Sequence, residues 1–164
     1  MFNIIKNLFK AKQIDAGTAW QQAGNDAGSA YWFYAMPVHL VLQRDTFSLA
    51  EPVPLILQTN EANALTVALN KHFNVDGIQF YWQQNSWYLS VNINPNITTF
   101  APQLAVNKHI DDFLPTGEGA AKWASFINEV QMLLFEHPIN VAREANKMFV
   151  INSIWCFDGG PKNR

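Results

Sequence analysis

The chain has 164 residues, which is enough for one domain with a substantial core, and a content of 49% hydrophobic and 13% aromatic residues excludes a disordered protein. The formal net charge is −2 and the pI is near 6.0, which excludes the strongly basic surface that nucleic-acid binding requires. The single cysteine, Cys156, excludes an internal disulfide framework and favours a reducing compartment such as the cytoplasm.

The first thirty residues are expected to differ from the rest. Apolar residues near helical spacing predict a short helix over residues 1–12, which is too short to span a bilayer. The helix either packs on the domain or a partner, or, as the less favoured alternative, contacts a membrane surface. Residues 13–30 are small, polar and glycine-containing, so we predict a linker or loop there, with one turn of helix at most. The predicted division is an N-terminal helix and linker over residues 1–30 and one domain over residues 31–164.

The domain is expected to begin with a hairpin and a helix. Alternating apolar residues predict a strand over residues 38–43, and a turn at Arg44 and Asp45 leads to a second strand over residues 46–49. A helix of about 14 residues follows, with Thr59 or Asn60 as its cap. Its apolar stripe consists of Ala62, Leu65, Leu69 and Phe73.

The middle of the chain predicts a second hairpin, over residues 78–83 and 87–93, followed by a long irregular segment. That segment, residues 94–119, contains prolines, glycines and polar residues, and a loop of this length usually serves a function or a partner. The helix after it is the clearest in the sequence. Its helically spaced apolar residues are Trp123, Phe126, Ile127, Val130, Leu133 and Leu134.

The last quarter of the chain predicts a helical break and a buried strand. Pro138 disfavours helical geometry at His137, and it suits the first turn of a new helix that runs through Ala145. Residues 149–157 form a β-branched and aromatic run typical of a strand buried on both faces. The predicted order is β-β-α-β-β-loop-α-α-β. We therefore predict an α+β fold with a mostly antiparallel sheet and helices on one face.

The break at Pro138 is the best candidate site. A helix that begins there leaves free N–H groups that attract anions, Arg143 has the geometry to bind a carboxylate or phosphate, and His137 could exchange a proton. Asn140 in the same helix and Asn152 in the apolar strand complete the predicted anion site. The alternative is structural: His137 caps the preceding helix, Asn140 and Asn152 bind backbone, and Arg143 pairs with an acid at position 136 or 144.

Motifs for a metal, a nucleophile or a cofactor are missing from the sequence, so no metal ligand, catalytic residue or cofactor is predicted. The four histidines are His39, His72, His109 and His137, and their spacing fits no common metal motif. Cys156 lies in an apolar run, which is typical of an inert buried thiol.

Several blocks of the sequence resemble known families. His137-Pro138-Ile139-Asn140, Arg143, Asn152-Ser153-Ile154-Trp155 and Gly159-Gly160 resemble a block of the archaeal-type, 2,3-bisphosphoglycerate-independent phosphoglycerate mutases. The chain more closely resembles proteobacterial regulatory proteins of the pathogenicity-factor (Rpf) E type, which are distant relatives of those mutases. This second likeness covers about residues 34–160 and rests on residues 36–40, 87–89, 112–115, 128–134 and 152–155.

The resemblance implies an accessory domain rather than a whole enzyme. The mutases carry a core with two metal ions and a Ser or Thr nucleophile, and this sequence shows no counterpart of that core. Phe157 stands where the family usually has Trp, and Asp158 stands where it usually has Gly. An acid at that position would repel a phosphate, which weakens the expectation of an inherited substrate contact.

Three functions follow as hypotheses. The first is a non-catalytic cytoplasmic binding or regulatory module for a small anion or a protein partner. The second is a phosphoglycerate mutase or phosphomonoester hydrolase with its catalytic core on a partner chain. The third is an assembly protein that uses exposed aromatics at residues 31–34 and the N-terminal segment as its interface.

Overall fold

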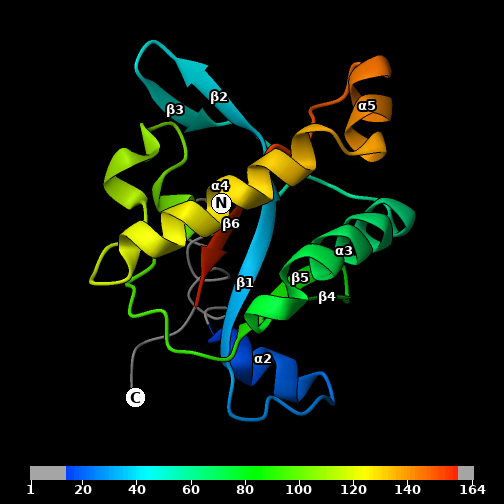
Figure 1. Ribbon diagram of the computed structural model, residues 1–164. Coiled ribbons are helices and arrows are strands. Elements are labelled where there is room, and N and C mark those ends of the chain that lie inside the picture. Colours follow the sequence, from blue (N-terminus) through cyan, green and yellow to red (C-terminus); the bar gives the residue numbers. More distant parts are fainter. Residues whose placement is uncertain (1–13, 159–164) are drawn as a thin grey trace, which may run out of the picture.

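The computed structural model describes residues 14–158, so the helix predicted over residues 1–12 and the Gly159-Gly160 pair lie outside the described residues. Four strands form one antiparallel sheet in the order β4-β5-β1-β6. Helices pack against this sheet, which confirms the predicted α+β fold (Figure 1). The strands are β1 (Tyr31–Val38), β4 (Ile78–Gln83), β5 (Ser86–Val91) and β6 (Ser153–Phe157).

The central strand, β1, is missing from the predicted element order. It pairs with β5 over residues 31–34 and with β6 over residues 34–38. Both faces of β1 are covered, so its residues show no simple alternation between apolar and polar types. Pro37, which ordinarily argues against a central strand, lies beyond the part of β1 that pairs with β5.

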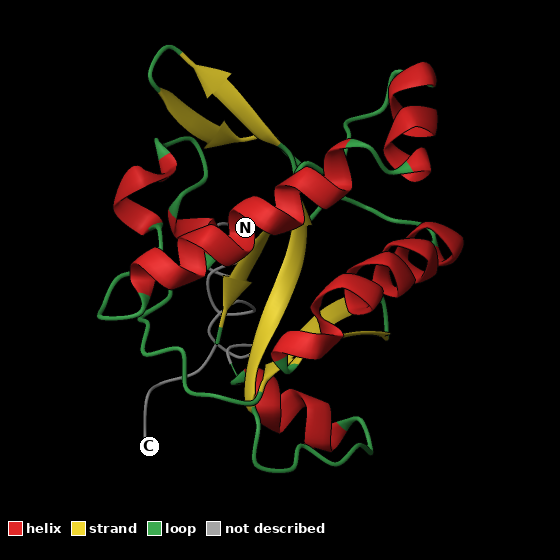
Figure 2. Ribbon diagram, in the orientation of Figure 1, coloured by secondary structure: helices red, strands yellow, loops and turns green. Residues whose placement is uncertain are grey.

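Two helices cover one face of the sheet: α3 (Thr59–Phe73) and α4 (Ala120–Phe135) (Figures 1 and 2). The predicted stripe of α3 is confirmed, because all four of its residues are buried. The N-cap of α3 is Gln58 rather than Thr59 or Asn60. Its backbone N–H donates to Oε1 of Glu61 at 3.1 Å, as in a capping box.

The opposite face of the sheet is covered in part by residues 101–113 and in part by α2 (Ala16–Gln22). This helix forms where the sequence predicts a linker or loop with one turn of helix. The Asp15 side chain caps this helix, and the Trp20 ring lies 4.9 Å from that of Trp32. Trp32 and Phe33 are buried on opposite faces of β1. The expectation that residues 31–34 present an exposed aromatic interface is therefore wrong, because these rings form the core on both sides of the sheet.

A separate two-stranded hairpin projects from the main sheet (Figure 2). Its strands are β2 (Leu40–Gln43) and β3 (Thr46–Leu49), and His39 interrupts the predicted strand 38–43. The long segment between β5 and α4 contains the short helices η2 (Pro102–Leu104) and η3 (Ile110–Phe113), while η1 (Asn74–Asp76) follows α3. As predicted, α5 (Pro138–Ala145) begins at the proline.

Candidate functional site

His137, at the joint between α4 and α5, is the N-cap of α5. Its Nδ1 accepts a hydrogen bond from the backbone N–H of Ile139 at 3.1 Å. Burial lowers the pKa of His137, which favours the neutral ring that this acceptor role requires. The imidazole therefore caps the following helix, not the preceding one as the structural alternative supposed.

Asn140 is 4% exposed and has its side-chain amide fully engaged with backbone groups. Nδ2 donates to the carbonyls of Leu134 and Ile151, at 2.8 Å each, and Oδ1 accepts from the N–H of Ile151 at 2.8 Å. The amide thus ties the end of α4 to the segment that leads into β6. A buried amide with these three bonds has a complete structural explanation.

Arg143 is also buried, and its guanidinium joins three parts of the chain. Nε donates to the carbonyl of Phe149 at 2.7 Å, and Nη1 donates to both carboxylate oxygens of Glu61, at 3.0 and 2.9 Å. The side chains are 5% and 13% exposed, so the ion pair between α5 and α3 is largely shielded from water. The partner of Arg143 is thus Glu61 on α3, and the expected partners at positions 136 and 144 are wrong.

Asn152 has a different structural role from His137, Asn140 and Arg143. Its Oδ1 accepts from the N–H of Leu40 at 2.7 Å, and its Nδ2 donates to the carbonyl of the same residue at 2.9 Å. His137, Asn140 and Arg143 share α5 and its cap, whereas Asn152 fixes the start of β2. Anion binding by these four residues stays a prediction, and an anion would have to replace the protein partners that they now have.

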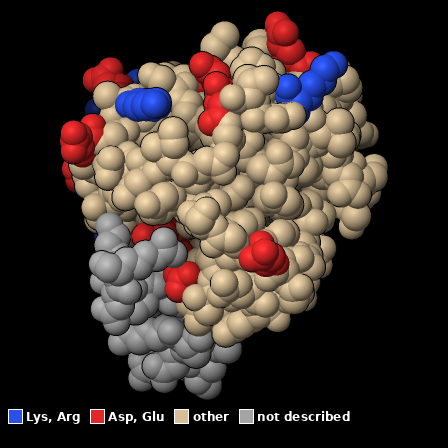
Figure 3. All heavy atoms as spheres, turned by 60° about the horizontal axis from the view of Figure 1, so that its bottom comes forward, with Lys and Arg blue, Asp and Glu red and all other residues tan. Residues whose placement is uncertain are grey.

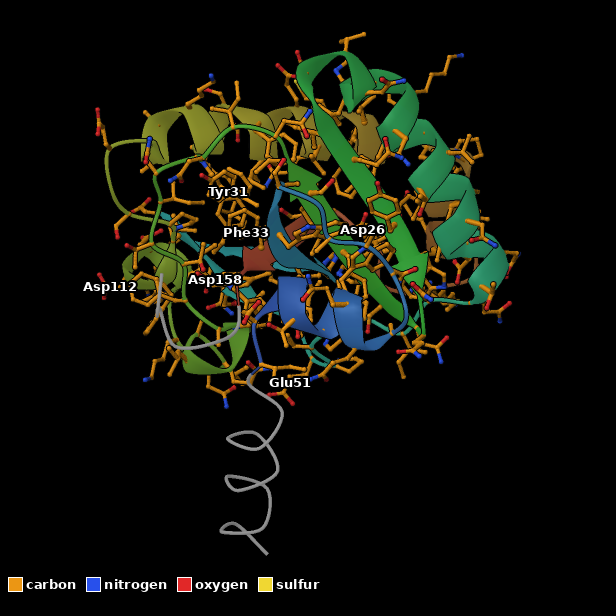
Figure 4. The ribbon with its side chains drawn as sticks, turned by 90° about the horizontal axis from the view of Figure 1, so that it is seen from below. Asp26, Tyr31, Phe33, Glu51, Asp112 and Asp158 are labelled. Carbon is orange, nitrogen blue, oxygen red and sulfur yellow. The ribbon has the colours of Figure 1, made fainter. Side chains whose placement is uncertain are left out.

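The histidines and acids of the described residues do not form a counterpart of the two-metal centre that the mutases carry in their core. Over residues 14–158, no group of three or more His, Cys, Asp or Glu residues is placed to hold a metal ion. His39 Nδ1 donates to the carbonyl of Val150, and His72 contacts Glu129 at 3.3 Å. Figure 4 shows that the labelled acids come from widely separated parts of the fold, namely Asp26, Glu51, Asp112 and Asp158.

Cys156 lies in the buried strand β6, and burial raises the pKa of its thiol. Nucleophilic cysteines require a thiolate, which this environment disfavours. The prediction of a buried thiol is confirmed, and the group offers no reactive site.

A hollow of about 760 Å³ lies between the β2–β3 hairpin and residues 107–113. Charged and polar side chains line it, among them Lys108, His109 and Asp112. The predicted anion site contains none of these residues. The signal that could have located the hollow is the long polar segment between β5 and α4, but the partner wall is a hairpin more than fifty residues earlier in the chain.

Three large apolar side chains near the α4–α5 joint are exposed. Met132 and Phe135, three residues apart on α4, are 73% and 81% exposed, and Val141 on α5 is 61% exposed. We call these three residues the apolar corner. A contiguous patch of exposed apolar side chains is typical of a surface that meets another molecule.

Charged side chains do not form a basic surface on the face shown in Figure 3. Lys and Arg side chains lie near its upper edge with acidic side chains close by, and most of the described part of this face is uncharged. In the described part of the chain, no helix is long and apolar enough to cross a membrane.

Comparison with known families finds a match over more than half of the chain. The family model described as 2,3-bisphosphoglycerate-independent phosphoglycerate mutase matches residues 50–140, which include α3, β4, β5, α4 and the start of α5. No curated protein and no solved structure matches the chain.

Proposed function

We propose that this chain, which belongs to the 2,3-bisphosphoglycerate-independent phosphoglycerate mutase family, is a non-catalytic binding or regulatory module of that family. Its role would be to dock on a protein partner through the apolar corner. Family membership alone does not carry an activity, so the argument rests on the α4–α5 region itself. Regulatory action of the Rpf E type and a cytoplasmic location, which suits the single buried thiol, belong to the same proposal.

The observation that carries the proposal is the contrast between the inside and the outside of the joint. Inside, Asn140 and Arg143 are bonded to backbone groups and to Glu61. Outside, Phe135 and Val141 remain exposed. A substrate site would use convergent polar groups that are open to a ligand. Here the buried polar groups are already bonded within the protein, and the large exposed side chains are apolar, as in the core of a protein interface.

The first experiment compares the wild type with a Phe135→Ser/Val141→Ser double variant in capture of partner proteins, with protein identification by mass spectrometry. Val67→Ser is the matched control, because Val67 is 69% exposed on α3. We expect the same protein to be captured by the wild type and the control but lost with the double variant. Capture that survives in the double variant would count against the apolar corner as the docking surface.

The second candidate function is a phosphoglycerate mutase or phosphomonoester hydrolase that needs a partner chain, and the family match favours it. Purified protein should then remain inactive with Mg²⁺ or Mn²⁺ and gain turnover when the captured partner is added. Under the non-catalytic proposal, neither preparation turns over. Turnover by the purified protein alone, with near-stoichiometric divalent metal, would overturn the proposal.

Anion binding at the joint is tested separately, with inorganic phosphate as the probe. Glu61 now occupies Nη1 of Arg143, so Glu61→Gln weakens the competition for the guanidinium. If the joint binds anions, phosphate should raise the melting temperature of Glu61→Gln more than that of the wild type. An equal response of both proteins would exclude Arg143 as the anion ligand.

A further inference from the structure

The hollow beside the β2–β3 hairpin has two walls that are tied to each other. Oγ1 of Thr46, in β3, donates to Oδ2 of Asp111, in η3, at 2.9 Å. Leu49, which also lines the hollow, is buried in a cluster that contains Val38, Ala105 and Ile110. The hollow is therefore framed by two elements that are anchored to the same apolar cluster and joined by a hydrogen bond.

The charges in the hollow are open to a ligand. Lys108 and Asp112 both line it, yet neither forms an ion pair or side-chain hydrogen bond within the described residues. Nζ of Lys108 lies 5.5 Å from the centre of the Phe113 ring, a cation–π contact that positions the ammonium without neutralising it. One cation and one anion thus remain available in the same hollow.

Neutral groups complete the lining. The amides of Gln43 and Asn107 and the hydroxyl of Ser48 offer both donors and acceptors, and no hydrogen bond within the described residues occupies these side chains. Asn107 adopts a left-handed conformation with φ 63°, which Asn tolerates better than most residues, and it directly precedes Lys108 and His109, which also line the hollow. Amide and hydroxyl groups of this kind recognise peptide-like N–H and C=O groups.

The presence of one positive and one negative side chain in the same hollow restricts the class of ligand. A simple anion would be attracted by Lys108 but repelled by Asp112. A simple amine would be attracted by Asp112 but repelled by Lys108. A molecule with both a carboxylate and an ammonium group satisfies both residues at once. The volume of about 760 Å³ lies within the range of small-molecule sites and exceeds the needs of a single inorganic ion.

We propose that the hollow between the β2–β3 hairpin and residues 107–113 binds a small zwitterion of the amino-acid or short-peptide class. Lys108 contacts the carboxylate, Asp112 contacts the ammonium group, and the neutral side chains bond the peptide unit between them. The site is independent of the apolar corner, which lies on α4 and α5.

The test uses the full chain and three matched probes: L-alanyl-L-alanine, its N-acetyl form, which lacks the cation, and its C-terminal amide, which lacks the anion. Titrations are followed by ¹H–¹⁵N spectra of the protein. We expect the free dipeptide to shift the amide signals of residues 43, 48 and 107–113, and to bind about three- to fivefold more tightly than either derivative.

Two substitutions test which charged group of the dipeptide each residue binds. In Lys108→Met, affinity for the free dipeptide should fall to that of the amide form, and in Asp112→Asn it should fall to that of the N-acetyl form. Lys122→Met and Asp76→Asn, exposed residues outside the hollow, are the matched controls and should bind like the wild type.

Three results would each overturn the proposal. The first is equal affinity for all three probes, and the second is no shift of the amide signals at the lining residues. The third is that inorganic phosphate binds more tightly than the dipeptide and loses its affinity in Lys108→Met, which would make the hollow an anion site.

Discussion

The α4–α5 joint and the hollow beside the β2–β3 hairpin both hold a cation, an acid, a histidine and amides, but they use them differently. At the joint, Arg143 and Asn140 are buried and every described contact is to a neighbouring protein group. In the hollow, Lys108 and Asp112 are exposed and have no ionic partner within the described residues. The residue types in the sequence suggest a ligand site at the joint. The hydrogen bonds and ion pairs of the structure suggest one in the hollow instead, because the charged side chains there form no ion pair in the described part of the chain.

The difference teaches that a polar residue near a helix end is informative only when its partners are known. Buried polar groups must be bonded, so a sequence that places Asn140 and Arg143 at a helix junction already demands partners for them. At the joint, the protein itself supplies these partners. In the hollow, Lys108 and Asp112 have no ionic partner within the described residues. Four mutational predictions test this contrast.

The largest effect is expected from Arg143→Met. The substitution leaves the carboxylate of Glu61, 13% exposed, without its cation, and loss of one member of a buried pair costs about 3–5 kcal/mol. Urea unfolding at neutral pH measures the change in free energy of unfolding. The double variant Glu61→Leu/Arg143→Met removes the stranded charge and should recover most of the loss. A loss below about 1 kcal/mol in Arg143→Met would show that the pair is not structural.

Asn140→Ala should cost about 2–3 kcal/mol, since it strands the N–H of Ile151 and removes donors to two carbonyls. Asn146→Ala is the matched control. Its exposed amide bonds only the carbonyl of Ala142, so we expect a change of no more than about 0.5 kcal/mol. Equal losses for the two variants would contradict the special role of the buried amide.

His137→Ala should cost about 1 kcal/mol through loss of the α5 cap, whereas His137→Asn should keep the cap. The two variants also separate capping from protonation. Burial lowers the pKa of His137 from its ordinary 6.5, so the unfolded chain binds the proton more readily than the folded one.

The stability contributed by the neutral ring is present above pH 6.5 and declines as the pH falls from 6.5 toward the lower pKa of the folded state. Urea unfolding across this range should show a weaker acid dependence for His137→Asn than for the wild type. The same slope in both proteins would mean that His137 titrates as an ordinary surface histidine.

The smallest effect on stability is expected in the hollow. Lys108→Met and Asp112→Asn remove exposed charges without ionic partners, so each should change the free energy of unfolding by less than about 0.5 kcal/mol. Thermal and urea unfolding measure this. Losses as large as that of Asn140→Ala would show that the hollow, too, is built for stability and would remove the contrast.

Local patterns predicted the elements whose burial follows a regular period. The stripe of α3, the long helix α4 and the break at Pro138 depend on spacing within a few residues, and all three are present. The central strand β1 was not predicted, because it is covered on both faces and contains Pro37. Its burial depends on α2 and on helices far along the chain, which no local period records.

Site prediction failed to find the partners for the same reason. The carboxylate that holds Arg143 belongs to Glu61, 82 residues earlier, while the sequence offered acids at positions 136 and 144 close by. The two walls of the hollow are likewise distant in sequence, with Thr46 bonded to Asp111 across 65 positions. Residue types located the groups capable of chemistry, but only long-range contacts decide which of them stay available.

The bond between Asn152 and Leu40 has a mechanical consequence. One side-chain amide engages both backbone groups of a single residue, as a neighbouring strand would, at the point where the chain leaves the main sheet for the hairpin. These two bonds fix the direction in which the hairpin leaves the main sheet. A ligand entering beside it would meet a wall already in position, and little of its binding energy would be consumed in arranging that wall.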